Sequence, residues 1–187
     1  MASDFFYFIS SLPLLRFGEK ASLDYDSFLG LSRTSLSEAE VDVLAKLQLF
    51  PVADSTVLPL LAQWQESEIY LRNLVAAARA RKQKTDGERW QRESNTFSAA
   101  LIKRVDEIMI LPNAWEKEMA LDLIRWQRLD ELSAGHFFDF TAVVIYALRL
   151  LILEKHRRYE EKPGSRFAAE LVEDGLQQAE AQRVETE

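Results

Sequence analysis

Cysteine is absent from the 187-residue sequence, and histidine is nearly absent. The lack of cysteine excludes disulfides, thiolate nucleophiles and cysteine-ligated metals. The two histidines, His136 and His156, stand too far apart to form the paired ligands of a helical zinc site. His156 lies in the charged run 154–158, which favours a solvated helix end over a metal-binding or general-base role. We therefore expect no metal, no cofactor and no catalytic residue.

Other signatures of enzymes and of nucleic-acid or membrane binding are missing as well. The sequence has no glycine-rich phosphate loop and no nucleophile elbow. A net charge of −7 argues against general affinity for nucleic acids or anionic membranes, because both require clustered positive charge. The longest apolar run, 141–153, is too short to span a bilayer, and the apolar start 5–15 lacks the features of a signal peptide. We expect a non-enzymatic cytoplasmic protein that reaches a membrane only through partners.

Glycine and proline, the residues that break helices, are scarce in the sequence. The 6 glycines and 5 prolines lie between segments of helical period, and no long stretch alternates like a half-buried strand. Apolar spacing predicts one helix that starts at Ser37 and others over 4–12, 24–31, 56–84, 88–111, 113–133, 137–161 and 165–182. The pattern predicts an all-α fold, an antiparallel bundle of about seven or eight helices with short connections. The chain would form one domain over 1–187, or two small lobes that meet near 86–88, with a frayed polar tail over 177–187.

Local signals mark several helix ends. Ser37 and Glu40 have the spacing of a capping box, and Asn113 precedes the sixth helix as a cap residue. Gly135 stands where the end of a helix favours a left-handed residue. The basic stretch 79–84 lies near the predicted end of a long helix, where cations suit the helix dipole, so we do not interpret it as a nucleic-acid site.

Three carboxylates fall on the apolar stripes of predicted helices, namely Glu68, Asp122 and Glu154. A carboxylate on a buried stripe is costly unless it is paired. Each has arginine within one turn: Arg72 follows Glu68, Arg125 follows Asp122, and Arg157 and Arg158 follow Glu154. Three hypotheses are open. The pairs lie at the margin of the core with their charged ends in water, they form a buried polar network that fixes helix register, or they make a partner-binding or catalytic site.

Aromatic residues cluster at two places. Four stand in a row at 5–8, and the second cluster comprises Phe137, Phe138 and Phe140. Four consecutive aromatic side chains cannot all face one side of a helix. The first cluster therefore docks against the rest of the bundle, or it leaves an exposed apolar patch of the kind that marks an interaction site.

Short motifs along most of the chain resemble an uncharacterised bacterial family whose members are typically encoded within V-type ATPase operons. The opening Phe-Phe-Tyr-Phe-Ile-Ser-Ser-Leu-Pro at 5–13 is similar to the aromatic-rich start of that family, which ends in Ser-Leu-Pro. Further similarity lies at Trp64, at the triplet Leu71-Arg72-Asn73, at Arg79, and at Arg125-Trp126 followed by Leu129-Asp130.

Such operons often lack a recognisable gene for the V-type ATPase subunit designated C, an all-helical funnel that joins the rotor shaft to the membrane ring. This funnel protein also opens with an aromatic helix, and it repeats helices that carry a glutamate followed by arginine-asparagine. The set Glu68, Arg72 and Asn73 is similar to this pattern, whereas the set at 154–158 lacks the asparagine. The chain is also shorter than a full funnel protein, so the resemblance implies a shortened body at most.

The resemblance implies a non-catalytic protein-binding subunit or accessory factor of a V-type ATPase, which docks to the central stalk, to the membrane ring, or to both and then couples them. Alternatives are a transient assembly or regulatory factor of the same complex, and an unrelated helical enzyme that uses the stripe carboxylates. The residues expected to contact the partner or to form the polar network are Phe5, Phe6, Tyr7, Glu68, Arg72, Asn73, Asp122, Arg125, Glu154 and Arg158.

Overall fold

The computed structural model of the protein describes residues 2–50, 58–86, 91–94 and 96–161. Within these residues it is all-helical, which confirms the predicted fold class. The helices are α1 (Ala2–Ser11), α2 (Tyr25–Ser35), α3 (Glu38–Ala45), α4 (Pro59–Gln83), α5 (Ala99–Ile110), α6 (Ala114–Leu132) and α7 (Phe140–Glu161). The predicted helix 165–182 and the predicted tail 177–187 lie outside the described residues. None of the described helices is long and apolar enough to cross a membrane.

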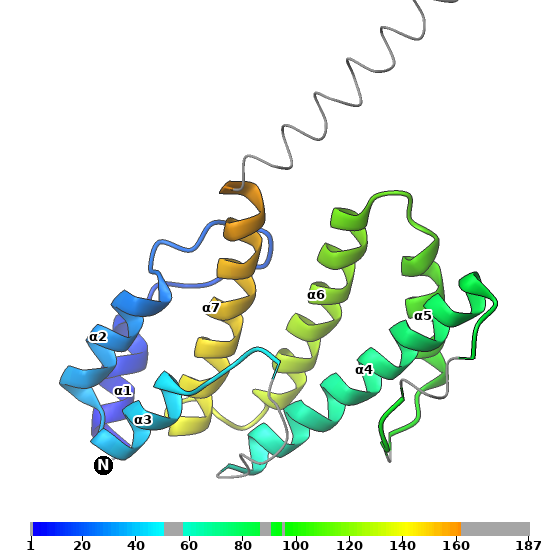
Figure 1. Ribbon diagram of the computed structural model, residues 1–187. Helices are drawn as coiled ribbons and strands as arrows, with labels where there is room; N and C mark the ends of the chain where they lie inside the picture. The colour runs from blue at the N-terminus through cyan, green and yellow to red at the C-terminus, as the bar shows by residue number, and fades with distance from the viewer. Residues whose placement is uncertain (1, 51–57, 87–90, 95, 162–187) are drawn as a thin grey trace, which may run out of the picture.

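Figure 1 shows α1, α2 and α3 on one side of α7, and α4, α5 and α6 on the other. The larger hydrophobic cluster joins α1, α2, α3 and α7 to the start of α4 and the end of α6, and it includes Phe28, Trp64 and Leu148. The smaller cluster lies between α4, α5 and α6, around Leu71 and Val105. Because α4 and α6 contribute to both clusters, these two helices connect the two halves of the bundle. The turn at 86–88, where two lobes are expected to meet, lies largely outside the described residues.

Helix α7 is the most buried element, as its apolar sequence predicts. Val144, Ala147, Leu150 and Ile152 are completely inaccessible to solvent, and Leu150 and Ile152 point to nearly opposite sides of the helix. A helix that is apolar on all sides can be stable only where other elements surround it. In the bundle α7 is covered by α1, α2, α3 and α6, and it therefore forms the centre of the larger cluster.

The α5 helix is shorter than predicted, and it runs in the same direction as α4 (Figure 1). Tyr70 lies beside Ser98 at the start of α5, and Arg81, further along α4, pairs with Asp106, further along α5. The prediction of a helix from 88 is wrong for residues 91–94 and 96–98, which are not helical. The other neighbouring pairs α4–α6, α5–α6 and α6–α7 are antiparallel, as expected.

Side chains of α4 hold the segment before α5 in its non-helical conformation. The Asn73 amide donates to the Arg92 carbonyl at 2.7 Å and accepts from the Arg92 N–H at 2.9 Å. Ser94 and Thr96 donate their hydroxyl hydrogens to Glu66 at 2.9 and 3.2 Å. Serine, threonine and asparagine readily make such local bonds in place of helical ones. These contacts explain why the helix begins only at Ala99, where Ser98 caps it.

The capping signals in the sequence are confirmed. The Ser37 hydroxyl accepts from the Glu40 N–H at 3.4 Å, and the Glu40 carboxylate accepts from the Ser37 N–H at 2.9 Å, which completes the capping box. Asn113 caps α6 by accepting from the Trp115 N–H at 2.8 Å. Gly135 has φ 85°, a left-handed conformation that favours glycine.

Lys84 ends α4 in the left-handed conformation, with φ 55° and ψ 38°. Glycine is the usual residue at such a helix end, because a side chain in this region costs roughly 1–2 kcal/mol. We expect Lys84→Gly to raise the free energy of unfolding by about 1 kcal/mol, measured by urea denaturation. The control is Lys82→Gly inside the last helical turn, which should lower that free energy by about 1 kcal/mol. Equal destabilisation by both changes would contradict the prediction.

Candidate functional site

Helices α4, α6 and α7 meet at a group of charged side chains that we call the ion cluster. Its members are Glu68 and Arg72 of α4, Glu118, Asp122 and Arg125 of α6, and Lys155 and His156 of α7. Each helix presents its charged residues from a mainly apolar stripe. The cluster therefore lies where the two hydrophobic clusters join, at the middle of the bundle.

Arg125 and Glu68 form a buried two-pronged ion pair between α6 and α4. The guanidinium donates from Nε to Oε2 and from Nη2 to Oε1, both at 2.9 Å. Glu68 is only 5% exposed and Arg125 only 6%. Arg72 adds a further bond from its Nε to Glu68 Oε1 at 2.9 Å, as predicted from their spacing on one helix. The fork geometry fixes the distance and the rotation of α6 relative to α4.

Asp122 is the most deeply buried member, with no exposed surface. Its carboxylate accepts from Arg125 Nη1 at 2.7 Å, from Lys155 Nζ at 2.9 and 3.0 Å, and from His156 Nε2 at 2.8 Å. Lys155 also pairs with Glu118. Asp122 thus joins α6 to α7, in the same way that Arg125 joins α6 to α4.

The charges of the ion cluster balance. Three carboxylates (Glu68, Glu118 and Asp122) face three cations (Arg72, Arg125 and Lys155). His156 must donate from Nε2, because an ionised carboxylate can only accept. Its Nδ1 is shielded from solvent and has no hydrogen-bond partner within the described part of the chain, so a proton there would be left unpaired. Nε2 is therefore the nitrogen through which His156 joins the ion cluster.

The expectation that His156 belongs to a solvated helix end is wrong, since the residue is buried. Its imidazole lies edge-on to the rings of Phe17 and Trp115, at centroid distances of 5.5 and 5.6 Å. Helix α6 covers the side of α7 on which His156 stands. The charged neighbours of His156 along the chain do not indicate this cover, because the covering residues come from distant segments.

Burial alone raises the pKa of Asp122, but the hydrogen bond from His156 and the charges of Lys155 and Arg125 outweigh it, so the pKa is lowered overall. For Arg125, burial alone lowers the pKa, and the bonds and charges of Glu68 and Asp122 more than compensate, so its pKa is raised. Both groups are thus held in their charged forms. The cluster stabilises the fold as ion pairs and hydrogen bonds together.

One aromatic ring covers the cations of the ion cluster. The Phe50 ring centroid lies 4.5 Å from Arg72 Cζ, 5.0 Å from Arg125 Cζ and 5.6 Å from Lys155 Nζ. Cations within about 6 Å of an aromatic face are attracted to it. Phe50 therefore contributes both apolar cover and attraction, a role that no sequence pattern predicts.

Three residues that were predicted to contact the partner or to form the polar network lie outside the ion cluster, namely Asn73, Glu154 and Arg158. Asn73 binds the Arg92 backbone and does not join the ion cluster. Glu154 accepts from the Tyr25 N–H at 2.6 Å and from Arg158 at 3.4 Å, so it anchors the start of α2. Glu68 and Asp122 follow the hypothesis of a buried network. The metal-site form of the enzyme hypothesis gains no support, because no group of three or more potential ligands among the described residues could hold a metal ion.

The predicted aromatic contact divides into a packed part and an exposed part. Phe5 packs against Phe140, with ring centroids 6.4 Å apart. Phe6 packs against Phe138 of the α6–α7 connection at 4.8 Å and against Tyr7 at 5.6 Å. The residues that remain accessible, which we call the aromatic face, are Phe6 (46% exposed), Tyr7 (73%), Phe137 (70%) and Phe138 (47%). Both sequence clusters of aromatics therefore contribute to one surface.

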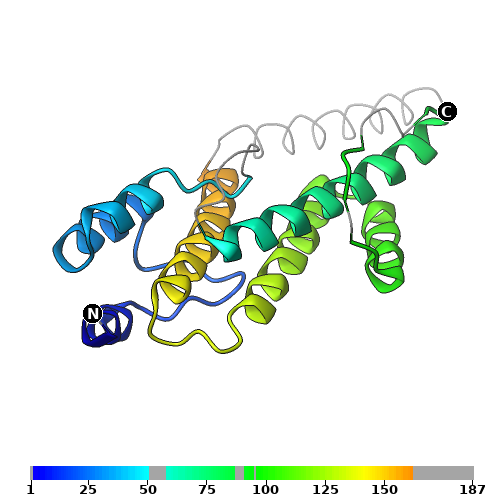
Figure 2. The same ribbon diagram turned by 90° about the horizontal axis from the view of Figure 1, so that it is seen from below.

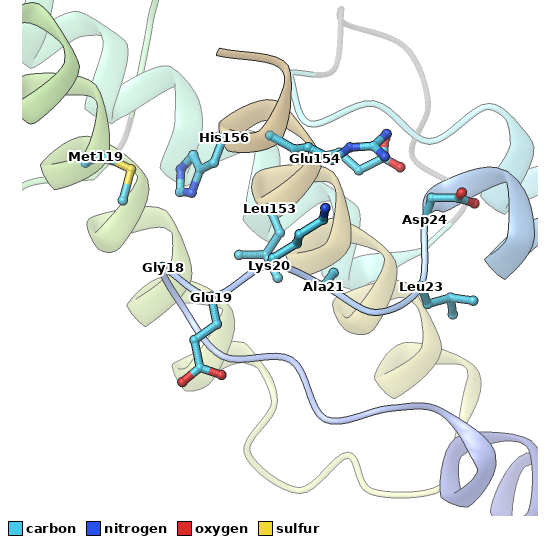
Figure 3. A pocket seen from close by; sticks show the side chains of 11 residues that line it. Gly18, Glu19, Lys20, Ala21, Leu23, Asp24, Met119, Leu153, Glu154 and His156 are labelled. Carbon is cyan, nitrogen blue, oxygen red and sulfur yellow. The ribbon is translucent and has the colours of Figure 1, made fainter. Parts of the chain in front are cut away.

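The sequence predicted no pocket, whereas the structure has at least three, one of which, of about 400 Å³, lies between the 47–50 segment and α7. Figure 3 shows a small pocket of about 150 Å³ between the 18–24 segment and α7, with Met119 and His156 on its α6 side. Of its three carboxylates, Asp24 and Glu154 are engaged at the start of α2 and Glu19 pairs with Arg16. His156 Nδ1 is shielded from solvent. A larger groove of about 630 Å³ lies between α4, α5 and α6, and the buried pair Glu68–Arg125 forms part of its wall. In the wall of this groove Glu68 pairs with Arg125, and Arg128 pairs with Glu131.

Comparison with known proteins concerns mainly the second part of the chain. A family model described as "Protein of unknown function (DUF2764)" matches residues 100–178, which is less than half of the chain. The matched region begins in α5 and contains α6 and α7, and it therefore includes Asp122, Arg125, Lys155 and His156 of the ion cluster. Comparisons with curated proteins and with solved structures give no match.

Proposed function

We propose that the chain is a non-catalytic, protein-binding subunit or accessory factor of a V-type ATPase. It would lie in the cytoplasm and be attached to the membrane through that complex, between the central stalk and the membrane ring. The observation that carries a protein-binding role is the aromatic face. The V-type ATPase as partner is supported by the resemblance of the 5–13 segment and of the Glu68, Arg72 and Asn73 set to proteins of such operons.

The aromatic face is large enough to be a contact site. Its four side chains leave roughly 350–600 Å² of aromatic surface in water, if each full side chain presents about 150–250 Å². Patches of this size on single chains are often functional, and aromatic residues dominate the binding energy of many interfaces. Phe6 and Tyr7 come from α1, whereas Phe137 and Phe138 come from the connection before α7, so the surface depends on the packed bundle.

The ion cluster suits a mechanical role. A protein that joins two parts of a complex must keep its shape while force passes through it. Pairs between α4 and α6 and between α6 and α7 resist sliding of these helices, because any shift would leave buried charges unpaired. The proposed mechanism therefore needs no cofactor, since the bundle acts as a stiff connector.

The test is copurification from cells in which the chromosomal copy carries a tag. Wild-type chain is expected to recover V-type ATPase subunits at close to one copy per complex. Tyr7→Ala combined with Phe137→Ala should reduce that recovery at least tenfold, because two exposed anchors of the contact are lost. The control is Phe97→Ala, which removes an equally exposed aromatic side chain before α5 and should leave recovery unchanged.

Other outcomes separate the alternatives. Recovery far below one copy per complex would favour a transient assembly or regulatory factor. If an intact ATPase is present in the solubilised membranes and none of its subunits is recovered with the wild-type chain, the proposal is wrong. Loss of binding in the Phe97 control as well as in the double variant would show that the aromatic face has no special role.

A further inference from the structure

The C-terminal end of α4 carries a strong positive charge on a negatively charged chain. Four cations stand within six residues, and all four side chains are exposed; we call them the basic end, and they are Arg79, Arg81, Lys82 and Lys84. The whole chain has a net charge of −7, so subtracting these four charges leaves −11 for the remainder. These four of the 23 lysines and arginines therefore form a local positive patch on a negatively charged chain.

Little of this charge is neutralised within the described part of the chain. Arg81 pairs with Asp106 of α5, yet the Arg81 side chain remains 61% exposed. Arg79, Lys82 and Lys84 have no ion-pair partner among the described residues. Attraction to the helix dipole favours cations here, but it acts within the last turn and is weak at an exposed end. It does not require four of them.

Lys84 adds a second and independent observation. It is the one non-glycine residue with positive φ in the described part of the chain, at a position where glycine would be more stable. Residues kept in unfavourable conformations are often found at functional sites. A lysine retained here extends the basic end by one charge beyond the helix, at a cost to stability.

The basic end and the aromatic face lie at opposite ends of the bundle. Figure 2 shows α1 at one extreme of the molecule and the end of α4 at the other, with α6 and α7 between them. The ion cluster lies on these connecting helices. A partner bound to the basic end would therefore be held at a fixed position relative to a partner bound to the aromatic face.

We infer that the basic end binds a short acidic segment of a protein partner, as a second contact surface of the chain. The inference rests on the proposed function only for the identity of that partner. A short segment suits the site because charges interact only over about 8–10 Å at physiological salt, so it avoids the negative remainder of the chain. A long polyanion such as DNA would meet that remainder. Residues 79–86 also contain no aromatic side chain on which a base could stack.

The test uses the full chain and a fluorescein-labelled peptide that contains eight consecutive glutamates, followed by fluorescence anisotropy. Wild-type chain is expected to bind at low salt and to lose roughly tenfold or more in affinity at 200 mM salt, because the attraction is screened. Arg79→Glu with Lys82→Glu should weaken low-salt binding at least tenfold. Lys84→Gly should weaken binding by a smaller factor while raising the melting temperature.

The matched control is Lys20→Glu with Arg33→Glu, which changes the net charge equally and includes a cation in the last turn of α2. It should bind the peptide nearly as tightly as wild type. Equal loss in both double variants, or no loss in the Arg79 and Lys82 variant, would overturn the inference. Tighter binding of a DNA duplex or of phosphatidylserine vesicles than of the peptide would overturn it too.

The two proposals can fail separately. If wild-type chain recovers no ATPase subunit but binds the acidic peptide through the basic end, the proposed function is wrong and the second surface stands. If the complex is recovered equally well with the Arg79 and Lys82 variant, and that variant also binds the peptide normally, the second surface is wrong and the proposed function stands.

Discussion

Arg125→Ala is expected to lower the free energy of unfolding by about 3–5 kcal/mol. The guanidinium is the partner shared by Glu68 and Asp122, which are 5% and 0% exposed. Removing it leaves the Glu68 carboxylate with Arg72 alone and takes one bond from Asp122. For a chain of this length the change corresponds to a fall of roughly 6–20 °C in melting temperature. Urea and thermal denaturation followed by circular dichroism would measure both quantities.

The control for Arg125→Ala is Arg81→Ala, which also removes an arginine from an ion pair between two helices. Both partners of the Arg81–Asp106 pair are exposed, at 61% and 40%, so the expected loss is below about 1 kcal/mol. A second comparison is between Arg125→Ala and the double variant Arg125→Met, Glu68→Leu. Because no unpaired Glu68 charge is then left behind, this double variant should recover a large part of the lost stability. Similar losses for Arg81→Ala and Arg125→Ala would contradict a special role of burial.

Asp122→Asn is expected to destabilise the protein by about 3 kcal/mol or more at neutral pH, because Arg125, Lys155 and His156 would face a neutral amide. The pKa of Asp122 is lower in the folded chain than the value of 3.8 for the free side chain. Because the folded pKa is depressed, the stability contributed by the ionised carboxylate is fully present above the unfolded pKa, near 3.8. This stability is lost as the pH falls through the lower, folded pKa. The stability gap between wild type and variant should therefore be constant from pH 7 to pH 5 and shrink below pH 3.8.

Urea denaturation at pH 7, 5, 4 and 3 would measure this gap. Asp42→Asn serves as the control, since Asp42 forms an exposed pair with Lys46 and should cost less than about 1 kcal/mol at every pH. A gap that widens in acid would show that Asp122 is protonated near neutrality in the folded chain, contrary to its surroundings. The direction of the change is therefore as informative as its size.

Charge pairs within one helix could be anticipated, whereas pairs between helices could not. The Glu68–Arg72 and Asp122–Arg125 pairs follow from spacings of four and three residues along a helix, and both are present. The Glu68–Arg125 and Asp122–Lys155 pairs join residues far apart in the chain. No periodicity in one segment indicates which side chain of another segment it will meet. For the same reason, the burial of His156 and the position of Phe50 above the cations could not be predicted from the sequence.

The errors along the chain have a related cause. The segments 91–94 and 96–98 contain residues that fit a helix, but Asn73 and Glu66 of α4 supply competing hydrogen bonds. The resemblance to the funnel protein groups Asn73 with Glu68 and Arg72, yet the Asn73 side chain bonds the Arg92 backbone. A residue's place on a helix sets the direction of its side chain, but only the packed fold decides what stands there.

The sequence by itself determined the all-α fold class, the capping box at Ser37, the left-handed turn at Gly135 and the deep burial of α7. These properties depend on contacts within a few residues, or on the apolar character of one segment. The tertiary structure alone decided that Glu68 and Asp122 share Arg125, and that two separate aromatic runs form one face. It alone also placed that face and the basic end at opposite ends of the bundle. Such features arise from the packing of distant segments. The free energy of that packing depends on all of these segments together, so the pattern of a single segment does not reveal it.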